Sequence, residues 1–285
     1  MFKKIGITIK WIGDHFKGML FLLILLLVFM PKSESGLQPA NLQEIKLIGP
    51  ITDADKILEE IDTAQKDRKI KGVLLNVNSP GGAVPPSIEI SYAIRELKKH
   101  KPVIAYASGT MASGSYYASI YASKIIANPG SIVGSIGVIM ESPNFAQLME
   151  KLGIGTQVVK QGTFKEAGTP TRIWTPQERE ELETLTKDTY RLFISDVAQA
   201  RGLDMTNDKT FADAHIFSAK RAKEAGLIDE IATKFQAKRE IAALAKIKKP
   251  HWKKRDKLES FIEKFTTQSL LRLQGYFYGL KSTLF

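Results

Sequence analysis

Cysteine is absent from this chain of 285 residues, and histidine is scarce. Without cysteine the protein has no disulfide framework, no zinc ribbon and no thiol nucleophile. The four histidines are His15, His100, His215 and His251, so histidine-based chemistry has few places to occur. Hydrophobic residues make up 44% of the chain and aromatic residues 9%, which is enough for a sizeable core. A wholly disordered chain is therefore excluded.

The central part of the chain also lacks an excess of charge of either sign. The formal net charge is +11, but residues 18–236 carry 25 basic and 25 acidic side chains. The whole excess lies in residues 1–17 and 237–285. A core that binds nucleic acid normally carries its own basic patch. We therefore expect no nucleic-acid partner, and the basic ends favour a membrane surface instead.

Long hydrophobic runs are lacking too, except for 13 uncharged residues at 18–30. A helix that spans a bilayer usually needs about 17 to 20 apolar residues. The run could be an uncleaved anchor, the apolar region of a cleaved signal peptide, or a buried core helix. The basic residues before it predict that residues 1–17 are cytoplasmic and that the rest lies outside the cytoplasm.

The predicted organisation has five parts. They are a basic cytoplasmic segment (1–17), a membrane anchor (18–31), a linker (32–42), a globular domain (43–236) and a basic amphipathic tail (237–285). Basic residues followed by apolar and aromatic ones are typical of a segment that binds a membrane surface. A helix docked on the core or on a neighbouring subunit would show the same pattern, and the sequence leaves both interpretations open.

Strands and helices alternate along the predicted domain. Short apolar runs predict strands at 45–48, 72–77, 102–107, 124–127 and 156–160. Helical patterns cover 53–67, 87–100, 144–152, 175–201 and 218–225. This alternation predicts the α/β class with a largely parallel sheet.

Ser113 is the best candidate nucleophile, because serine is the natural choice when cysteine is absent. It follows a predicted strand and begins a helix of small residues. The amides at a helix start can face an anion, so the Gly114 N–H and the Gly82 N–H could stabilise an oxyanion. The simpler interpretations are that Ser113 caps the helix and that Gly82 belongs to a tight turn.

The base for such a serine would be a histidine or a neutral lysine. Only His215 lies in a plausible core position, but no motif links it to a serine, which favours a surface role. Lys165 stands in a loop among an aromatic residue and small residues. Desolvation there would disfavour the charged amine. Composition alone favours an ordinary surface lysine.

Several motifs occur in a fixed order. They are NSPGG (78–82), MASGSYY (111–117), GSIGV (134–138), Gly162 with Lys165, and AKRAKEAGLID (219–229). Over residues 43–232 the chain resembles the short, single-unit bacterial signal peptide peptidases SppA, of peptidase family S49. The resemblance implies a Clp-protease/crotonase fold and a membrane-anchored serine endopeptidase with no cofactor or metal.

The same resemblance implies roles for individual residues. Ser113 would be the nucleophile, Lys165 the general base, Gly82 and Gly114 the oxyanion hole, and Ser135 the residue that orients the lysine. The chain departs from the family at Ser115, where a second glycine is usual. Glu166 must point away from Lys165, because a carboxylate close to the Lys165 amine favours its protonated form.

The implied substrates are remnant signal peptides and other short apolar peptides. The implied assembly is a ring, expected to be an octamer, in which the dyad is completed within or between subunits. The catalytic domain would lie on the outer side of the cytoplasmic (inner) membrane. Two other functions remain open: a crotonase-type acyl-CoA hydratase or isomerase, and a non-catalytic membrane scaffold.

Overall fold

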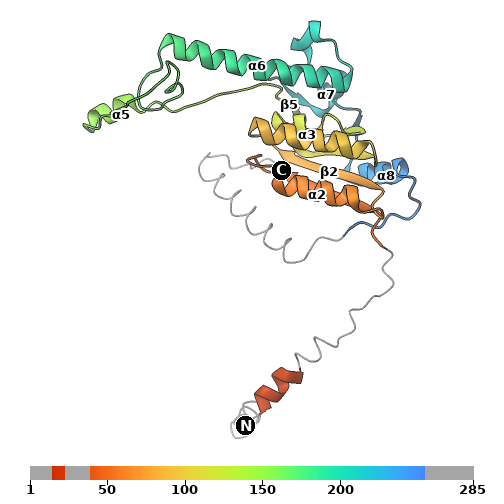
Figure 1. Ribbon diagram of the computed structural model, residues 1–285. Coiled ribbons are helices and arrows are strands. Elements are labelled where there is room, and N and C mark those ends of the chain that lie inside the picture. Colours follow the sequence, from red (N-terminus) through yellow and green to blue (C-terminus); the bar gives the residue numbers. More distant parts are fainter. Residues whose placement is uncertain (1–14, 23–38, 254–285) are drawn as a thin grey trace, which may run out of the picture. The chain divides into compact units, whose positions relative to one another are not determined.

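The computed structural model describes residues 15–22 and 39–253 (Figure 1). The chain divides into two units, Met1–Pro39 and Ala40–Phe285. In the first unit, residues 15–22 are helical, with exposed side chains that include Phe16 and Phe21. Most of the predicted anchor (18–31) lies outside the described residues, as do the cytoplasmic segment up to residue 14 and the tail beyond 253. Among the described helices, none has the length and apolar character needed to cross a membrane.

The second unit is built on a seven-stranded, mostly parallel sheet, as the alternating pattern predicts. Its main path runs β1-β2-β3-β4-β7, with every neighbouring pair parallel. β5 pairs with β3 in parallel, and β6 pairs with β5 antiparallel. The strands are β1 (Leu42–Ile48), β2 (Gly72–Ser79), β3 (Val103–Ala112), β4 (Lys124–Ala127), β5 (Ile132–Gly134), β6 (Ile216–Ser218) and β7 (Glu230–Ile231).

β3 is the longest strand and changes partner along its length. Its first half pairs with β4, from Ile104 to Ala107, and its last residues, Thr110 to Ala112, pair with β5. The sheet therefore forks at the carboxyl end of β3. In parallel sheets this end is where ligand sites usually form.

Both faces of the sheet are covered, which explains why its strands are apolar runs rather than alternating ones. On one face, Val73, Leu75 and their neighbours pack with α2 (Asp55–Lys66), α3 (Val84–Lys98) and α4 (Gly114–Ser119). On the other face, Leu74 and Ile104 pack against α8 (Lys234–Leu244). Figure 1 shows α2 and α3 lying along the sheet.

The predicted boundary between residues 236 and 237 lies inside α8. Ala237, Ile241 and Ala242 of this helix are buried in the second apolar cluster. Trp252 packs against the same cluster and forms a β-bridge with Leu42. The packed unit therefore continues to the last described residue, 253.

Residues 139–174, which we call the arm, leave the sheet and carry α5 (Ala146–Lys151) before returning to α6 (Pro176–Arg201). Figure 1 shows α5 at the far end of this extension. The strand predicted at 156–160 is wrong, because these residues form no strand and are all exposed. Val158 and Val159 suit a strand, but among residues 15–22 and 39–253 no strand pairs with them.

The start of α6 follows the sequence closely. Thr175 accepts a hydrogen bond from the amide of Glu178, whose carboxylate accepts one from the amide of Thr175. This is the predicted capping box. The helices that follow α6 are the 3₁₀ helix Met205–Thr210, α7 (Ala219–Glu224) and α8. Ser218 caps α7.

Candidate functional site

Ser113 occupies the turn between β3 and α4 in an unusual backbone conformation. Its φ is 53° and its ψ is −127°, a region that residues other than glycine rarely adopt. Its amide donates to the carbonyl of Gly134 (2.8 Å), and its carbonyl accepts from the amide of Tyr117 (3.0 Å). Two hydrogen bonds therefore hold the strained turn in place. Such strain is common at functional sites, which makes Ser113 a stronger candidate than its sequence context alone.

The Ser113 side chain does not cap α4. No hydrogen bond joins its hydroxyl to the helix amides, although Ser113 stands at the N-cap position. The N-cap interpretation is therefore wrong for this serine. Its half-buried hydroxyl makes no hydrogen bond to any other group among the described residues, which leaves it available for chemistry.

Two glycine turns meet beside Ser113 with their backbones almost in contact. A Cβ on Gly114 would lie 2.3 Å from the Ser87 Oγ and 3.3 Å from the amide nitrogen of Gly82. A Cβ on Gly82 would lie 2.1 Å from the carbonyl oxygen of Ile51. Gly82 therefore has no space for a side chain because it would meet backbone, whereas at Gly114 a side chain would first meet the Ser87 hydroxyl. Within residues 15–22 and 39–253, neither the Gly82 nor the Gly114 amide donates to a hydrogen bond, so both remain available to an incoming oxygen.

Ser115 fixes the two turns relative to each other. Its fully buried hydroxyl donates to the carbonyl of Ser79 at the end of β2 (2.7 Å) and accepts from the amide of Ala112 at the end of β3 (2.8 Å). Sequence reasoning noted Ser115 only as a departure from the family. Its hydroxyl instead ties together the ends of the two strands that carry the glycine turn and the serine.

A small apolar pocket opens next to Ser113. The residues that line it come from the glycine turns, from α3, α4 and α6, and from the segment after β5: Gly82, Val84, Ser87, Ile88, Ser113, Gly114, Tyr117, Gly137, Val138, Thr189, Leu192 and Phe193. Among these lining residues there is no carboxylate and no histidine. The pocket suits an apolar group held close to the serine hydroxyl.

One wall of this pocket is held by a buried polar pair. The hydroxyl of Tyr117 donates a short hydrogen bond to the Oδ2 of Asp196 on α6. The Tyr117 ring also packs on Phe193, with ring centroids 4.7 Å apart. Burial, and secondarily the hydrogen bond to Asp196, raises the pKa of the Tyr117 phenol. The phenol therefore stays protonated and remains a donor. Tyr117 belongs to the MASGSYY motif, but no pattern in the sequence indicates its pairing with Asp196.

Ser135 lies close to Ser113 along the backbone. It follows Gly134, whose carbonyl accepts from the Ser113 amide, and it has a positive φ of 51°. Its amide donates to the carbonyl of His215 (2.7 Å). The His215 side chain is exposed and lies near Phe217 rather than in the pocket, which fits the surface role favoured by the sequence.

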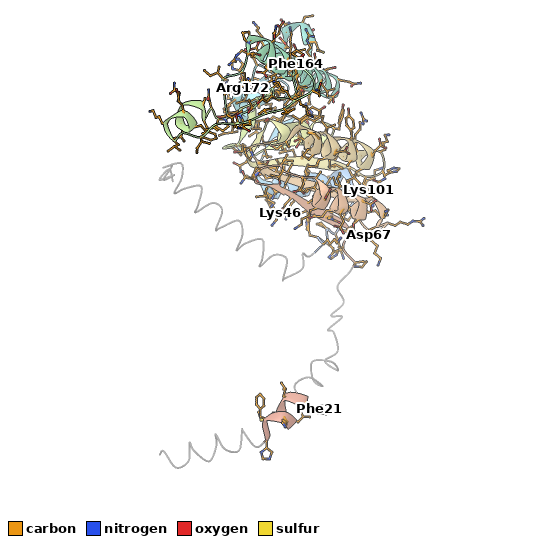
Figure 2. The ribbon with its side chains drawn as sticks, turned by 60° about the vertical axis from the view of Figure 1, so that its left-hand side comes forward. Phe21, Lys46, Asp67, Lys101, Phe164 and Arg172 are labelled. Carbon is orange, nitrogen blue, oxygen red and sulfur yellow. The ribbon has the colours of Figure 1, made fainter. Side chains whose placement is uncertain are left out.

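Lys165 lies on the arm and does not line the Ser113 pocket. Its side chain is exposed, and its amide donates to the carbonyl of Gly162 (3.3 Å). In Figure 2 its neighbour Phe164 lies with Arg172 in the part of the molecule that carries α6. A single chain therefore brings together Ser113, Gly82, Gly114 and the backbone of Ser135, but it does not bring Lys165 into their pocket.

The Glu166 carboxylate is occupied by two cations. It lies 3.0 Å from the Lys160 Nζ and 3.0 Å from an Nη of Arg172. Hydrogen bonds from Arg172 and then Lys160 hold the pKa of this carboxyl below its usual range. These two ion pairs engage Glu166 with cations other than Lys165; that its carboxylate points away from the Lys165 amine stays a prediction. No group of acidic or histidine side chains in the described part of the chain is arranged to hold a metal ion.

Residues 95–248 match the family model described as "Peptidase family S49", which covers more than half of the chain and includes Ser113, Ser135 and Lys165. The chain belongs to peptidase family S49. It is 41% identical over 198 residues to a Methanocaldococcus jannaschii protein named as a candidate protease, covering 70% of this chain and 64% of that protein.

Two further relatives carry more specific names. One is an Enterococcus faecium protein named as a candidate signal peptide peptidase SppA; it is 36% identical over 175 residues, covering 61% of this chain and 51% of that protein. The other is the chloroplastic serine protease SPPA of Arabidopsis thaliana. It is 31% identical over 179 residues, covering 62% of this chain and 26% of that protein. The match thus spans less than two thirds of each of these three relatives.

Proposed function

We propose that this chain is a serine endopeptidase in which Ser113 is the nucleophile and Lys165 the general base. The observation that carries the proposal is the strained Ser113 turn, whose unbonded hydroxyl faces an apolar pocket beside two free glycine amides. Membership of a peptidase family supports the same conclusion. The name of the Arabidopsis relative, a serine protease, supports serine as the nucleophile.

The proposed reaction is acyl transfer from a peptide bond to the serine. Lys165 accepts the proton of the Ser113 hydroxyl, and the oxygen attacks the carbonyl carbon of the substrate. The amides of Gly82 and Gly114 donate hydrogen bonds to the tetrahedral oxyanion. The lysine ammonium protonates the departing amine, and a water molecule then hydrolyses the acyl-enzyme, returning the serine hydroxyl.

The base is supplied by a neighbouring copy of the chain. Lys165 does not line the pocket of its own chain, which favours a dyad that is completed by the arm of another subunit. The arm exposes large apolar side chains, including Ile139 (83% exposed), Val159 (100%) and Ile173 (74%). Exposed apolar surface of this kind marks an interaction site. A head-to-tail contact that closes generates a ring, and we expect an octamer, as in the family that the sequence resembles.

Short apolar peptides are the proposed substrates, with remnant signal peptides as the main class. Val84, Ile88 and Leu192 offer an apolar surface for the side chain that precedes the cut. The absence of a carboxylate among the lining residues disfavours a crotonase-type hydratase, which usually needs a carboxylate base. The Ser113 hydroxyl beside the pocket disfavours a purely structural scaffold.

The proposed location is the outer side of the cytoplasmic (inner) membrane, with residues 18–31 as the anchor. The support is the uncharged run at 18–30 and the basic residues before it. Such an anchor would keep the pocket close to peptides that remain in the bilayer after secretion.

Mixing two inactive variants tests the shared dyad. We expect Ser113→Ala and Lys165→Ala each to abolish peptidase activity, and Ser113→Ala also to abolish labelling by a fluorophosphonate. When the two are assembled together at equal amounts, about a quarter of the neighbouring pairs combine an intact serine with an intact lysine, so about a quarter of the activity should return.

Two controls accompany the mixing experiment. Mixing either variant with the Ser113→Ala/Lys165→Ala double variant should restore nothing, and Lys151→Ala, which removes another lysine of the arm, should keep wild-type activity. Full activity in Ser113→Ala would overturn the proposed function. Absence of recovery in the mixed assembly would exclude a dyad shared between subunits.

A further inference from the structure

The residue that follows the proposed base in the sequence carries a carboxylate. Glu166 is the next residue in the chain, and its side chain is only 19% exposed. A negative charge close to an amine favours the protonated amine, which cannot accept a proton from serine. The loop therefore requires a device that neutralises or redirects this carboxylate.

Arg172 binds Glu166 and the start of α6 at the same time. Its Nη2 lies 3.0 Å from the Glu166 Oε2, while its two Nη atoms contact the two carboxylate oxygens of Glu178 at 2.6 and 2.8 Å. A guanidinium is suited to this double contact because it is planar and presents several donors in fixed directions.

Glu178, the second carboxylate that Arg172 binds, is held in place by other contacts. Glu178 is 3% exposed, belongs to the capping box of α6, and also accepts a hydrogen bond from the Thr175 amide (2.9 Å). The Arg172 hydrogen bonds are the main reason why the pKa of Glu178 falls to about 2. Because α6 also forms a wall of the Ser113 pocket through Leu192 and Phe193, the arginine connects the base loop to a helix that lines a pocket.

We propose that Arg172 is a positioning residue that holds the Glu166 carboxylate away from the Lys165 amine and fixes the base loop to α6. This inference rests on the proposed role of Lys165. Two cations, Lys160 and Arg172, face Glu166, and Arg172 is also paired with Glu178. In the described part of the chain, Lys165 itself forms no ion pair, and Glu166 is the charged residue nearest to it in the sequence.

The signs of the expected pH effects follow from this arrangement. In Arg172→Gln a cation is lost and Glu166 is released, so Lys165 keeps its proton to higher pH. The acid limb of the kcat/KM profile should then move up by about 0.5 to 1 pH unit. In Glu166→Gln the carboxylate is lost while both cations remain, so the acid limb should move down.

The experiment measures kcat/KM of the full-length assembled protein against pH, using a short apolar peptide. It compares wild type with Arg172→Gln, Arg172→Lys, Glu166→Gln and the Arg172→Gln/Glu166→Gln double variant. Arg172→Lys should correct the shift only in part, because one amine cannot reproduce the double contact. The double variant loses one charge of each sign, so its limb should lie near that of wild type. Arg179→Gln, which removes another arginine near the start of α6, is the control and should not move the limb.

Opposite shifts in the two single variants would support the proposal, because damage to the fold cannot move the limb in both directions. Glu166→Gln keeps the Arg172–Glu178 contact, so it remains informative even if Arg172→Gln folds poorly. Unshifted limbs in both single variants, with Lys165→Ala inactive, would overturn the role of Arg172 alone. Wild-type activity in Lys165→Ala would instead refute the proposed base.

Discussion

Replacing Tyr117 by phenylalanine should destabilise the protein while leaving its serine intact. The tyrosine is 4% exposed and Asp196 is 8% exposed, so both groups of this hydrogen bond lie inside the fold. In the described part of the chain no cation pairs with Asp196. The phenol is therefore the partner that makes burial of this carboxylate tolerable, and Tyr117→Phe removes it without changing the shape of the ring.

The size of the effect follows from the class of bond that is lost. A hydrogen bond to a charged group contributes about 1.5 to 3 kcal/mol, and a buried charge left without its partner costs about 3 kcal/mol or more. We expect Tyr117→Phe to lower the free energy of unfolding by about 3 kcal/mol. For a unit of this size, about 2 to 4 °C in Tm accompanies each kcal/mol, so Tm should fall by about 6 to 12 °C.

A double-mutant cycle separates this bond from general loss of packing. Asp196→Asn removes the charge, so Tyr117→Phe added to it should cost about 2 kcal/mol less than it costs alone. Urea unfolding at neutral pH measures all four proteins, and fluorophosphonate labelling of Ser113 checks that the pocket persists. A Tm for Tyr117→Phe within about 1 °C of wild type, or a cycle with no coupling, would refute the reasoning.

Three further outcomes are expected. Gly114→Ala should abolish fluorophosphonate labelling, because its Cβ would lie 2.3 Å from the Ser87 Oγ, and Ser87→Gly should restore part of the labelling in the double variant. Gly82→Ala should not be rescued in this way, because its Cβ would meet the backbone of Ile51 at 2.1 Å, so loss of soluble protein is expected in expression trials. The pKa of Glu178 is lowered to about 2, so its contribution to stability is present above the ordinary value of 4.5 and disappears as the pH falls towards 2; urea unfolding at pH 5 and pH 3 should show a step that Glu178→Gln reduces.

The parts of the site that depend on local chain geometry could be predicted from the sequence. Ser113 follows an apolar strand and precedes small residues, and the structure places it at the corresponding strand-to-helix turn. Gly82 ends the turn after the neighbouring parallel strand, and neighbouring parallel strands bring their carboxyl ends together. The capping box at Thr175 was also predictable, because its signal lies within four consecutive residues.

The contacts that sequence reasoning missed are those between distant segments. Ser115 joins the ends of two strands through one hydroxyl, and Tyr117 meets Asp196 across 79 positions of sequence. Nothing in the local pattern marks a serine or an aspartate for such a partner. The strand expected at 156–160 is wrong for a related reason, because strand propensity has no effect where the fold offers no neighbouring strand.

The two halves of the proposed dyad are held by different physical means, and this difference has a consequence for regulation. Ser113 and its glycine amides are fixed by buried backbone contacts at the fork of the sheet. Lys165 lies on the arm, which is joined to α6 by the ion pairs of Arg172 with Glu166 and Glu178. If the arm must reach a neighbouring chain to complete the site, a single copy holds a prepared serine without its base. Activity per chain should then fall on dilution together with the assembly, which would restrict proteolysis to places where the protein is concentrated.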